Sequence, residues 1–194
     1  MEKIFGQRSK QKQNINKYNT TMKPILLLTC FLFLSVNTFA QNSPEQKLKE
    51  LGVTLPEIAE PTANFVHVVR TGNLLFLAGK GSRNADGSLI TGKVGRDLTV
   101  EEGYEAAKTI ALQHLAVIKN EIGSLDKVTR IVKVLGMVNA TTDFTRQSSV
   151  INGYSDFMVE IFGDNGKHAR SAVGMGSLPA NLAVEIEVIV EIQD

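Results

Sequence analysis

The segment from His168 to Ile192 places charged residues in a long apolar run. Arg170 stands near its start, and Glu185 and Glu187 lie in a stretch that otherwise has the composition of a core strand. A guanidinium is a planar, permanently charged fork that binds carboxylates through two hydrogen bonds, and a carboxylate can accept a proton from water. Two interpretations follow: the charges pair with each other across a sheet, or they serve a small ligand.

The beginning of the chain is typical of a secretory signal peptide. Met22 to Ala40 contains Lys23, an apolar run from Ile25 to Val36, and small residues before a cleavage point after Ala40. The run of about 12 residues is shorter than the roughly 20 that span a bilayer. We therefore expect residues 1–40 to be removed and the protein to be exported, periplasmic or secreted, without a membrane anchor.

Two alternatives concern details of this segment. Residues 1–21 are polar and basic, so they are either an extended amino-terminal region or lie before a true start at Met22. Cys30 would permit a lipoprotein signal, but it lies in the middle of the apolar run rather than after it, which disfavours lipidation.

Removal of residues 1–40 changes the composition. Residues 41–194 keep 15 of the 21 basic residues and 19 of the 20 acidic ones, for a net charge of −4, which argues against nucleic acid as a partner. They contain no cysteine, and this excludes a disulfide framework, a zinc–thiolate site and a cysteine nucleophile. His67 and His114 lack a second ligand at metal spacing, so we expect no metal site.

The remaining chain divides into a lead-in and one domain. Residues 41–60 are interrupted by prolines and contain a short predicted helix over 45–51, whereas residues 61–194 are expected to form a single folded domain. The domain begins with two strand-like runs around Thr71-Gly72-Asn73, which predict a hairpin.

Helix signals then alternate with strand signals. Thr99 and Glu102 form a capping-box pattern at the start of a helix that ends at Gly123. A β-branched strand follows over 128–138, and a second helix closes at Gly163. Its apolar stripe is formed by Val150, Tyr154, Phe157 and Ile161.

Two final strands are predicted over 170–175 and 183–192. The order ββ–α–β–α–ββ favours an α+β fold: a mixed β-sheet with two helices on one face. The second face of the sheet also carries apolar residues, and no helix remains to cover it. We expect another subunit to cover that face.

The sequence from Pro61 to Glu191 resembles the RidA/YjgF/UK114 family. The resemblance is carried by Gly72-Asn-Leu-Leu-Phe-Leu-Ala-Gly79, Arg170-Ser171, Leu178-Pro179 and Val184-Glu-Ile-Glu187, in this order. The His168-Ala-Arg-Ser-Ala-Val-Gly segment is more typical of a divergent branch. The resemblance implies a chorismate-mutase-like fold and homotrimers whose clefts lie between subunits.

The resemblance also implies an activity and a site. Family members hydrolyse small enamino and imino acids, such as 2-aminoacrylate and 2-iminopropionate, to 2-oxo acids and ammonia, without cofactor or metal. Arg170 matches the carboxylate-binding arginine and Glu185 the acidic residue near the cleft, so these two are the candidate catalytic residues.

Four further positions are expected to contact the substrate together with Arg170. Gly79 matches the family, whereas Phe65, Ala78 and Ala172 stand where the deaminases usually carry tyrosine, serine and cysteine. Loss of such polar groups often costs on the order of 100-fold in rate. This departure favours an alternative: a trimeric protein that binds a small carboxylate without turnover. An endoribonuclease is a weaker alternative because the chain from residue 41 onward is acidic.

Overall fold

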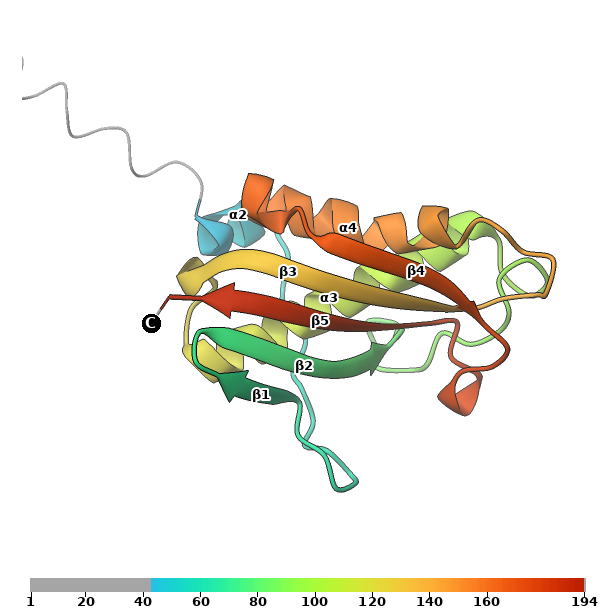
Figure 1. Cartoon of the computed structure of the whole chain (residues 1–194), viewed down its shortest axis with the longest axis horizontal. Helices are drawn as coiled ribbons and strands as arrows, with labels where there is room; N and C mark the ends of the chain where they lie inside the picture. The colour runs from blue at the N-terminus through green and yellow to red at the C-terminus, as the bar shows by residue number, and fades with distance from the viewer. Residues whose placement is uncertain (1–42, 194) are drawn as a thin grey trace, which may run out of the picture. The chain divides into compact units, whose positions relative to one another are not determined.

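The structure, a computed structural model, describes residues 43–193; the predicted signal peptide and its cleavage point lie outside this range. A five-stranded sheet is backed by two long helices (Figure 1). Three short 3-10 turns connect elements: Leu125–Lys127, Gly163–Gly166 and Pro179–Asn181. Among the described residues, no helix is long and apolar enough to cross a membrane. The helices are α2 (Pro44–Glu50), α3 (Val100–Ile122) and α4 (Gln147–Phe162), and the strands are β1 (Val68–Thr71), β2 (Leu74–Gly81), β3 (Val128–Asn139), β4 (Ala169–Met175) and β5 (Val184–Ile192).

The described part of the lead-in packs against the domain. Ser43 caps α2 by accepting the Gln46 N–H, and Leu48 is buried in the core. Glu45 forms a salt bridge with Lys119 at 2.6 Å and accepts the Leu125 N–H. The short predicted helix is thus confirmed, and its first turn is tied to the end of α3.

Helix α3 begins and ends as its sequence predicts, and α4 ends at Gly163 as predicted. Thr99 and Glu102 form the complete capping box at the start of α3, and Gly123 ends it in the left-handed conformation. Helix α4 buries its predicted stripe, with Tyr154 fully enclosed. These helices pack closely because Gly153 of α4 faces the Tyr104 backbone of α3, where a Cβ would overlap the carbonyl oxygen.

The sheet is mixed, as expected, but its last two strands are not neighbours. The strand order is β1-β2-β5-β3-β4, so β5 inserts between β2 and β3 and is antiparallel to both. β4 is parallel to β3 at the edge, because α4 carries the chain across the sheet between them. This order separates Arg170 on β4 from Glu185 on β5 by one intervening strand.

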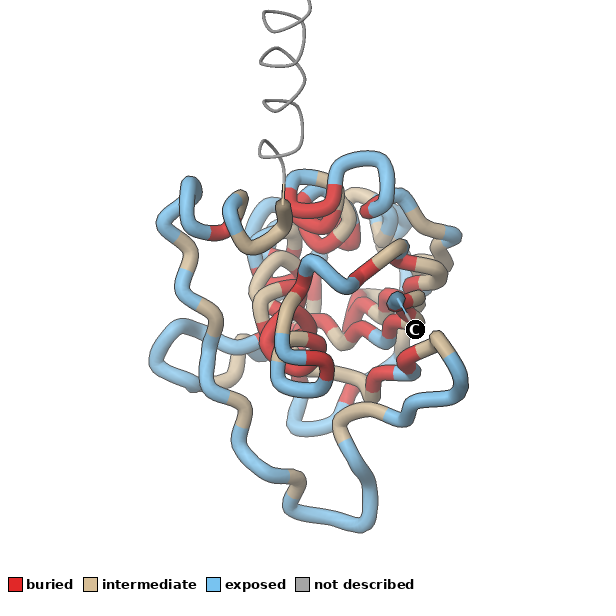
Figure 2. Tube along the Cα trace, turned by 90° about the vertical axis from the view of Figure 1, so that its left-hand side faces the viewer, coloured by how far each residue is buried: buried red, intermediate tan, exposed pale blue. Residues whose placement is uncertain are grey.

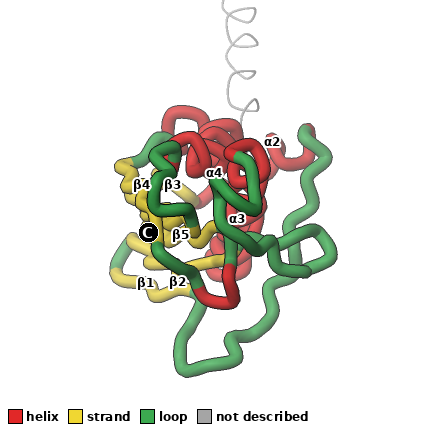
Figure 3. The backbone as a smooth tube through the Cα atoms, turned by 90° about the vertical axis from the view of Figure 1, so that its right-hand side faces the viewer, coloured by secondary structure: helices red, strands yellow, loops and turns green. Residues whose placement is uncertain are grey.

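The core lies between the sheet and the helices. Residues of β5 alternate between the two faces of the sheet: Val184, Ile186, Val188 and Val190 are buried on the helix side. Figure 2 shows buried segments where the two layers meet, and Figure 3 shows α3 and α4 on one side of the strands.

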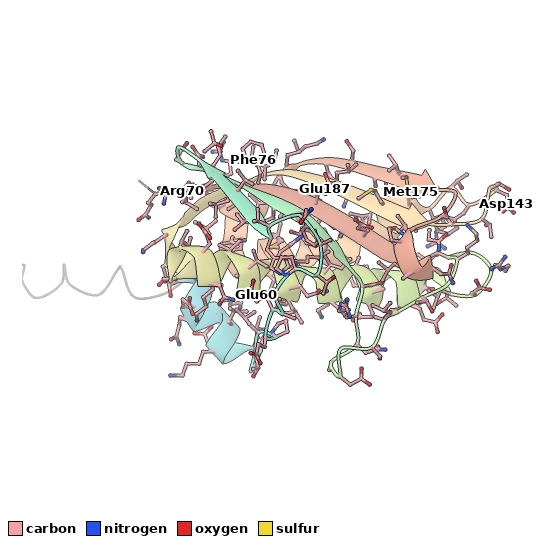
Figure 4. All side chains as sticks on the ribbon, turned by 90° about the horizontal axis from the view of Figure 1, so that it is seen from below. Glu60, Arg70, Phe76, Asp143, Met175 and Glu187 are labelled. Carbon is pink, nitrogen blue, oxygen red and sulfur yellow. The ribbon has the colours of Figure 1, made fainter. Side chains whose placement is uncertain are left out.

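The opposite sheet face has no covering element among residues 43–193. Phe76 projects from it, away from α3 (Figure 4), and is 41% exposed; Val69 on β1 and Val173 on β4 are 53% and 39% exposed. We call this surface the open face. Exposed apolar side chains on a sheet face often meet another protein chain.

Candidate functional site

A β-bulge positions two of the predicted site residues, Ala78 and Gly79. The register between β2 and β5 shifts after Leu77, which is opposite Val188, so that Lys80 is opposite Ile186. One extra residue is therefore accommodated in β2, and it bends the strand. Gly79 faces the open side of the sheet beneath Glu185, and a Cβ at this position would overlap Glu185 Oε1. A side chain at position 79 would therefore displace the Glu185 carboxylate from this place.

The Glu185 carboxylate is half-buried and has no compensating partner among residues 43–193. None of the three salt bridges between described residues involves it, and no hydrogen bond from the described chain stabilises its charge. Burial, with a smaller contribution from the neighbouring Glu187 carboxylate, raises the pKa of Glu185 above its ordinary value. A carboxylate with a raised pKa and no internal partner suits general acid–base chemistry.

Phe65 and His67 lie beside the bulge. The His67 carbonyl accepts the Ala78 N–H at 3.0 Å, and the rings of Phe65 and His67 meet edge to face with centroids 6.1 Å apart. The Lys80 ammonium donates to His67 Nδ1 at 2.7 Å, and His67 Nε2 donates to the Ala59 carbonyl at 2.8 Å. Phe65, Ala78, Gly79 and Glu185 are therefore brought into one neighbourhood.

A buried histidine holds the bulge from the helix side. His114 Nε2 donates to the Ala78 carbonyl at 3.4 Å, and the Tyr154 hydroxyl donates to His114 Nδ1 at 3.0 Å. Burial lowers the pKa of His114 to about 3, so the ring stays neutral and can both donate and accept. His114 is fully buried in the core.

His114 should make the protein lose stability in mild acid. Its folded pKa of about 3 lies below the ordinary 6.5, so between these values the unfolded chain takes up a proton that the folded chain does not. Stability should fall as pH drops, by about 2 kcal/mol between pH 7 and pH 5. Urea unfolding at both pH values should show a smaller difference in His114→Gln; an equal difference would contradict this assignment.

Arg170 lies on the other side of the sheet. Its register partner on β3 is Val134, a fully buried core residue, so the Arg170 side chain starts on the helix side of edge strand β4. Nη1 donates to Asn152 Oδ1 and to Ser155 Oγ of α4, both at 2.9 Å. The described chain contains no salt bridge between Arg170 and Glu185 or Glu187, so the cross-strand pair considered from the sequence does not form.

The predicted site residues thus form two clusters. Ala172, opposite Gly136, shares the helix side of β4 with Arg170 and packs against the core. Glu185 is opposite Met137, which lies between two buried residues of β3 and therefore faces the open side of the sheet. The two charged side chains start on opposite faces of the sheet, roughly 10 Å apart across two strand spacings and roughly 10 Å apart along the strand direction, because their partners on β3 are three residues apart. A single chain cannot place both on one small ligand.

Asn152 and Ser155, the two partners of Arg170 on α4, were not predicted from the sequence. They lie three residues apart, which places them on the same side of α4. Two polar residues at this spacing, beside the buried stripe of a helix, could have indicated a polar contact between α4 and edge strand β4. His168 also bonds to Ser155, with Nε2 lying 3.0 Å from Ser155 Oγ.

A shallow groove of about 350 Å³ crosses the open face beside the Glu185 cluster. Its apolar lining includes Val66, Val69, Phe76 and Leu135, and two charged residues, Lys133 and Glu187, flank it. The Lys133 ammonium donates to Ser171 Oγ at 2.9 Å. The apolar lining favours contact with a protein surface over binding of a small charged metabolite in this groove.

Comparison with known proteins identifies the family to which this fold corresponds. The family model that matches residues 45–192 is described as "YjgF/chorismate_mutase-like, putative endoribonuclease". Protein TCP17 of Trypanosoma cruzi is 42% identical over 148 residues, which cover 76% of this chain and 92% of that protein.

Two solved structures are also similar. Atu1372 from Agrobacterium tumefaciens has a TM-score of 0.71 at 42% identity, covering 77% of this chain and 94% of that one. A "putative endoribonuclease" from Shewanella oneidensis MR-1 has a TM-score of 0.74 at 30% identity, covering 78% and 100%.

The mixed sheet with two helices on one face defines a chorismate-mutase-like α+β protein. The chain belongs to the YjgF/chorismate-mutase-like family, which is the RidA/YjgF family that the sequence resembles. That prediction and the predicted fold class are confirmed. The divergent branch, the trimer and the site roles stay predictions.

Proposed function

We propose that the protein hydrolyses small imino and enamino acids, of the 2-iminopropionate and 2-aminoacrylate type, in a cleft shared by two subunits. The observation that carries this proposal is a half-buried, unpaired Glu185 carboxylate held over Gly79. An unpaired buried charge costs stability, and such a cost is typical of groups retained for chemistry. Arg170 supplies the complementary feature, a guanidinium that forms no salt bridge within residues 43–193.

The reaction needs few groups. Arg170 binds the carboxylate of the imino acid, which fixes the plane of the neighbouring C=N bond. Glu185 accepts a proton from water as the water oxygen bonds to the imine carbon, and it then passes that proton to the nitrogen, which gives a carbinolamine. In the second step Glu185 accepts the hydroxyl proton of the carbinolamine and returns it to the nitrogen. The C–N bond breaks as the C=O bond forms, which releases the 2-oxo acid and ammonia.

The separation of Arg170 and Glu185 within one chain is the reason for proposing a cleft between subunits. Because these groups lie on opposite sheet faces of one chain, a shared ligand requires Arg170 from one subunit and Glu185 from the next. A closed ring of three subunits would supply three such clefts and cover the apolar open face. In this arrangement Phe65, Ala78 and Gly79 accompany Glu185, and Ala172 accompanies Arg170.

The activity can be measured directly. 2-Iminopropionate is generated in situ by an amino acid oxidase acting on alanine, and its loss is followed by trapping with semicarbazide, with and without the protein. The proposal expects faster decay of the imine and faster appearance of pyruvate and ammonia. Equal decay rates at micromolar protein would contradict it.

A second candidate function is carboxylate binding without turnover. Phe65, Ala78 and Ala172 contribute no side-chain hydrogen-bonding groups, and Lys80 beside the bulge is already bonded to His67. This function would give calorimetric binding of pyruvate with unchanged imine decay. The same two experiments therefore separate the candidates.

The endoribonuclease description belongs to the family model and to the Shewanella oneidensis relative. In this chain the net charge of −4 over residues 41–194 weakens attraction to a polyanion. Incubation with labelled RNA serves as a counter-assay; cleavage that Arg170→Lys and Glu185→Gln leave intact would point to a different site.

Export remains a separate prediction, since residues 1–40 lie outside the described range. Amino-terminal sequencing of the protein from its native host should begin at or near Gln41, after the apolar run from Ile25 to Val36 has been removed. A cytoplasmic, full-length species would overturn the prediction.

A further inference from the structure

His168 and Ser155 form a hydrogen-bonded line that ends at Arg170. His168 Nδ1 lies 2.7 Å from the Gly166 carbonyl oxygen, and Nε2 lies 3.0 Å from Ser155 Oγ. A carbonyl oxygen only accepts, so Nδ1 carries the hydrogen and Nε2 of the neutral ring accepts the Ser155 hydroxyl. Burial lowers the pKa of His168, which is consistent with this neutral form.

The hydrogen bond from Ser155 to His168 determines whether Ser155 donates to Arg170 or accepts from it. Because the only hydroxyl hydrogen of Ser155 is directed at His168, its oxygen lone pairs are left to accept from the guanidinium. Arg170 Nη1 donates there and to Asn152 Oδ1, both at 2.9 Å. Both hydrogens of Nη1 are thereby used.

The opposite edge of the guanidinium remains open. Neither Nε nor Nη2 of Arg170 has a hydrogen-bond partner within residues 43–193. These two N–H groups are parallel, and they form the side-on fork that binds both oxygens of a carboxylate. An arginine at an edge strand normally has many accessible rotamers, so fixing one edge reduces the entropy lost when the other edge binds a ligand.

We propose that Ser155 and His168 are positioning residues that hold the Arg170 guanidinium with its Nε/Nη2 edge presented to a small carboxylate ligand. This inference rests on the proposed function. The ring of Tyr154 packs against the His168 ring from the core side, edge to face with centroids 6.4 Å apart, and this contact helps to hold His168 in place. The two residues act through Arg170 and need not touch the substrate.

The test compares matched variants of the assembled protein by titration with pyruvate. Ser155→Ala removes the acceptor and should weaken binding by roughly 3- to 10-fold, the range of one net hydrogen bond. Ser148→Ala, an exposed serine on the same helix, should leave affinity unchanged. His168→Leu should weaken binding as Ser155→Ala does, whereas His168→Gln, whose amide oxygen can accept the Ser155 hydroxyl, should restore most of it.

A spectroscopic readout makes the test independent of the ligand. In 15N NMR of the Arg170 side chain, identified by its loss in Arg170→Lys, the held guanidinium should give separate Nη1 and Nη2 signals. Ser155→Ala and His168→Leu should let the group rotate and merge the signals, and Ser148→Ala and His168→Gln should not.

The outcomes distinguish this inference from the proposed function. If the unmodified protein binds pyruvate and Ser155→Ala binds it equally well, the positioning role is overturned and the proposed function stands. If the unmodified protein binds no pyruvate, the proposed ligand class is overturned. The proposed role of Ser155 and His168 in carboxylate binding is then overturned with it. Merged guanidinium signals in the unmodified protein would overturn the inference on their own.

Discussion

Glu185→Gln is expected to slow hydrolysis of 2-iminopropionate by on the order of 100-fold or more, the range that general acid–base catalysis contributes. The amide keeps the shape of the side chain over Gly79 but cannot accept a proton from water. Stability should be unchanged or higher, because the substitution removes a half-buried charge that has no partner in the described chain. The measurement is the semicarbazide-trapped decay rate beside a thermal melt of each protein.

The same residue sets an expected pH dependence. As the base, Glu185 must be ionised, so kcat/KM should fall as pH decreases through its pKa, which lies above the ordinary value. Glu121→Gln, an exposed residue near the end of α3, serves as the control and should change neither rate nor profile. A Glu185→Gln protein with the same rate and the same acid limb would exclude this residue as the base.

Arg170→Lys is expected to weaken binding of pyruvate or 2-oxobutyrate by roughly 10- to 100-fold, which corresponds to the 1.5–3 kcal/mol of a hydrogen bond to a charged group. Lysine keeps the positive charge but loses the planar fork and the two bonds to α4. The melting temperature should fall only modestly, because the loss is limited to these two hydrogen bonds and Arg170 forms no salt bridge among residues 43–193. Calorimetric titration of both proteins checks this result.

Arg130→Lys provides the matched control, because Arg130 is an exposed strand residue of β3. It should bind the 2-oxo acid as the unmodified protein does. If Arg170→Lys binds equally tightly, or if the unmodified protein shows no binding at millimolar ligand, Arg170 does not clamp a carboxylate.

Local patterns predicted the elements because each depends on neighbouring residues. The Thr99–Glu102 capping box marks the start of α3, and the alternation in β5 assigns its buried face correctly. The pairing of the strands was harder to predict from the sequence. Insertion of β5 between β2 and β3 depends on contacts far apart in the chain, so the sequence could not show that Arg170 and Glu185 start on opposite faces.

The site residues themselves were found through resemblance, and their surroundings required the structure. The bulge that brings Gly79 beneath Glu185 is a register shift between two strands, which no local pattern specifies. The same holds for His168, whose ring reaches Ser155 across the gap between β4 and α4. Polar residues at the edge of an apolar helix stripe are ordinary, and only the three-dimensional contact distinguishes Ser155 from its neighbours.

The central claim is that one cleft takes Arg170 from one subunit and Glu185 from another. Arg170→Ala and Glu185→Gln proteins, each inactive alone, are unfolded, mixed in equal amounts and refolded, and light scattering confirms that the mixture has the same mass as the unmodified assembly. Random assortment in a closed ring gives about a quarter of the clefts both native residues, so about a quarter of the unmodified imine hydrolysis rate should return. A mixture that remains as inactive as its parents would contradict the shared cleft.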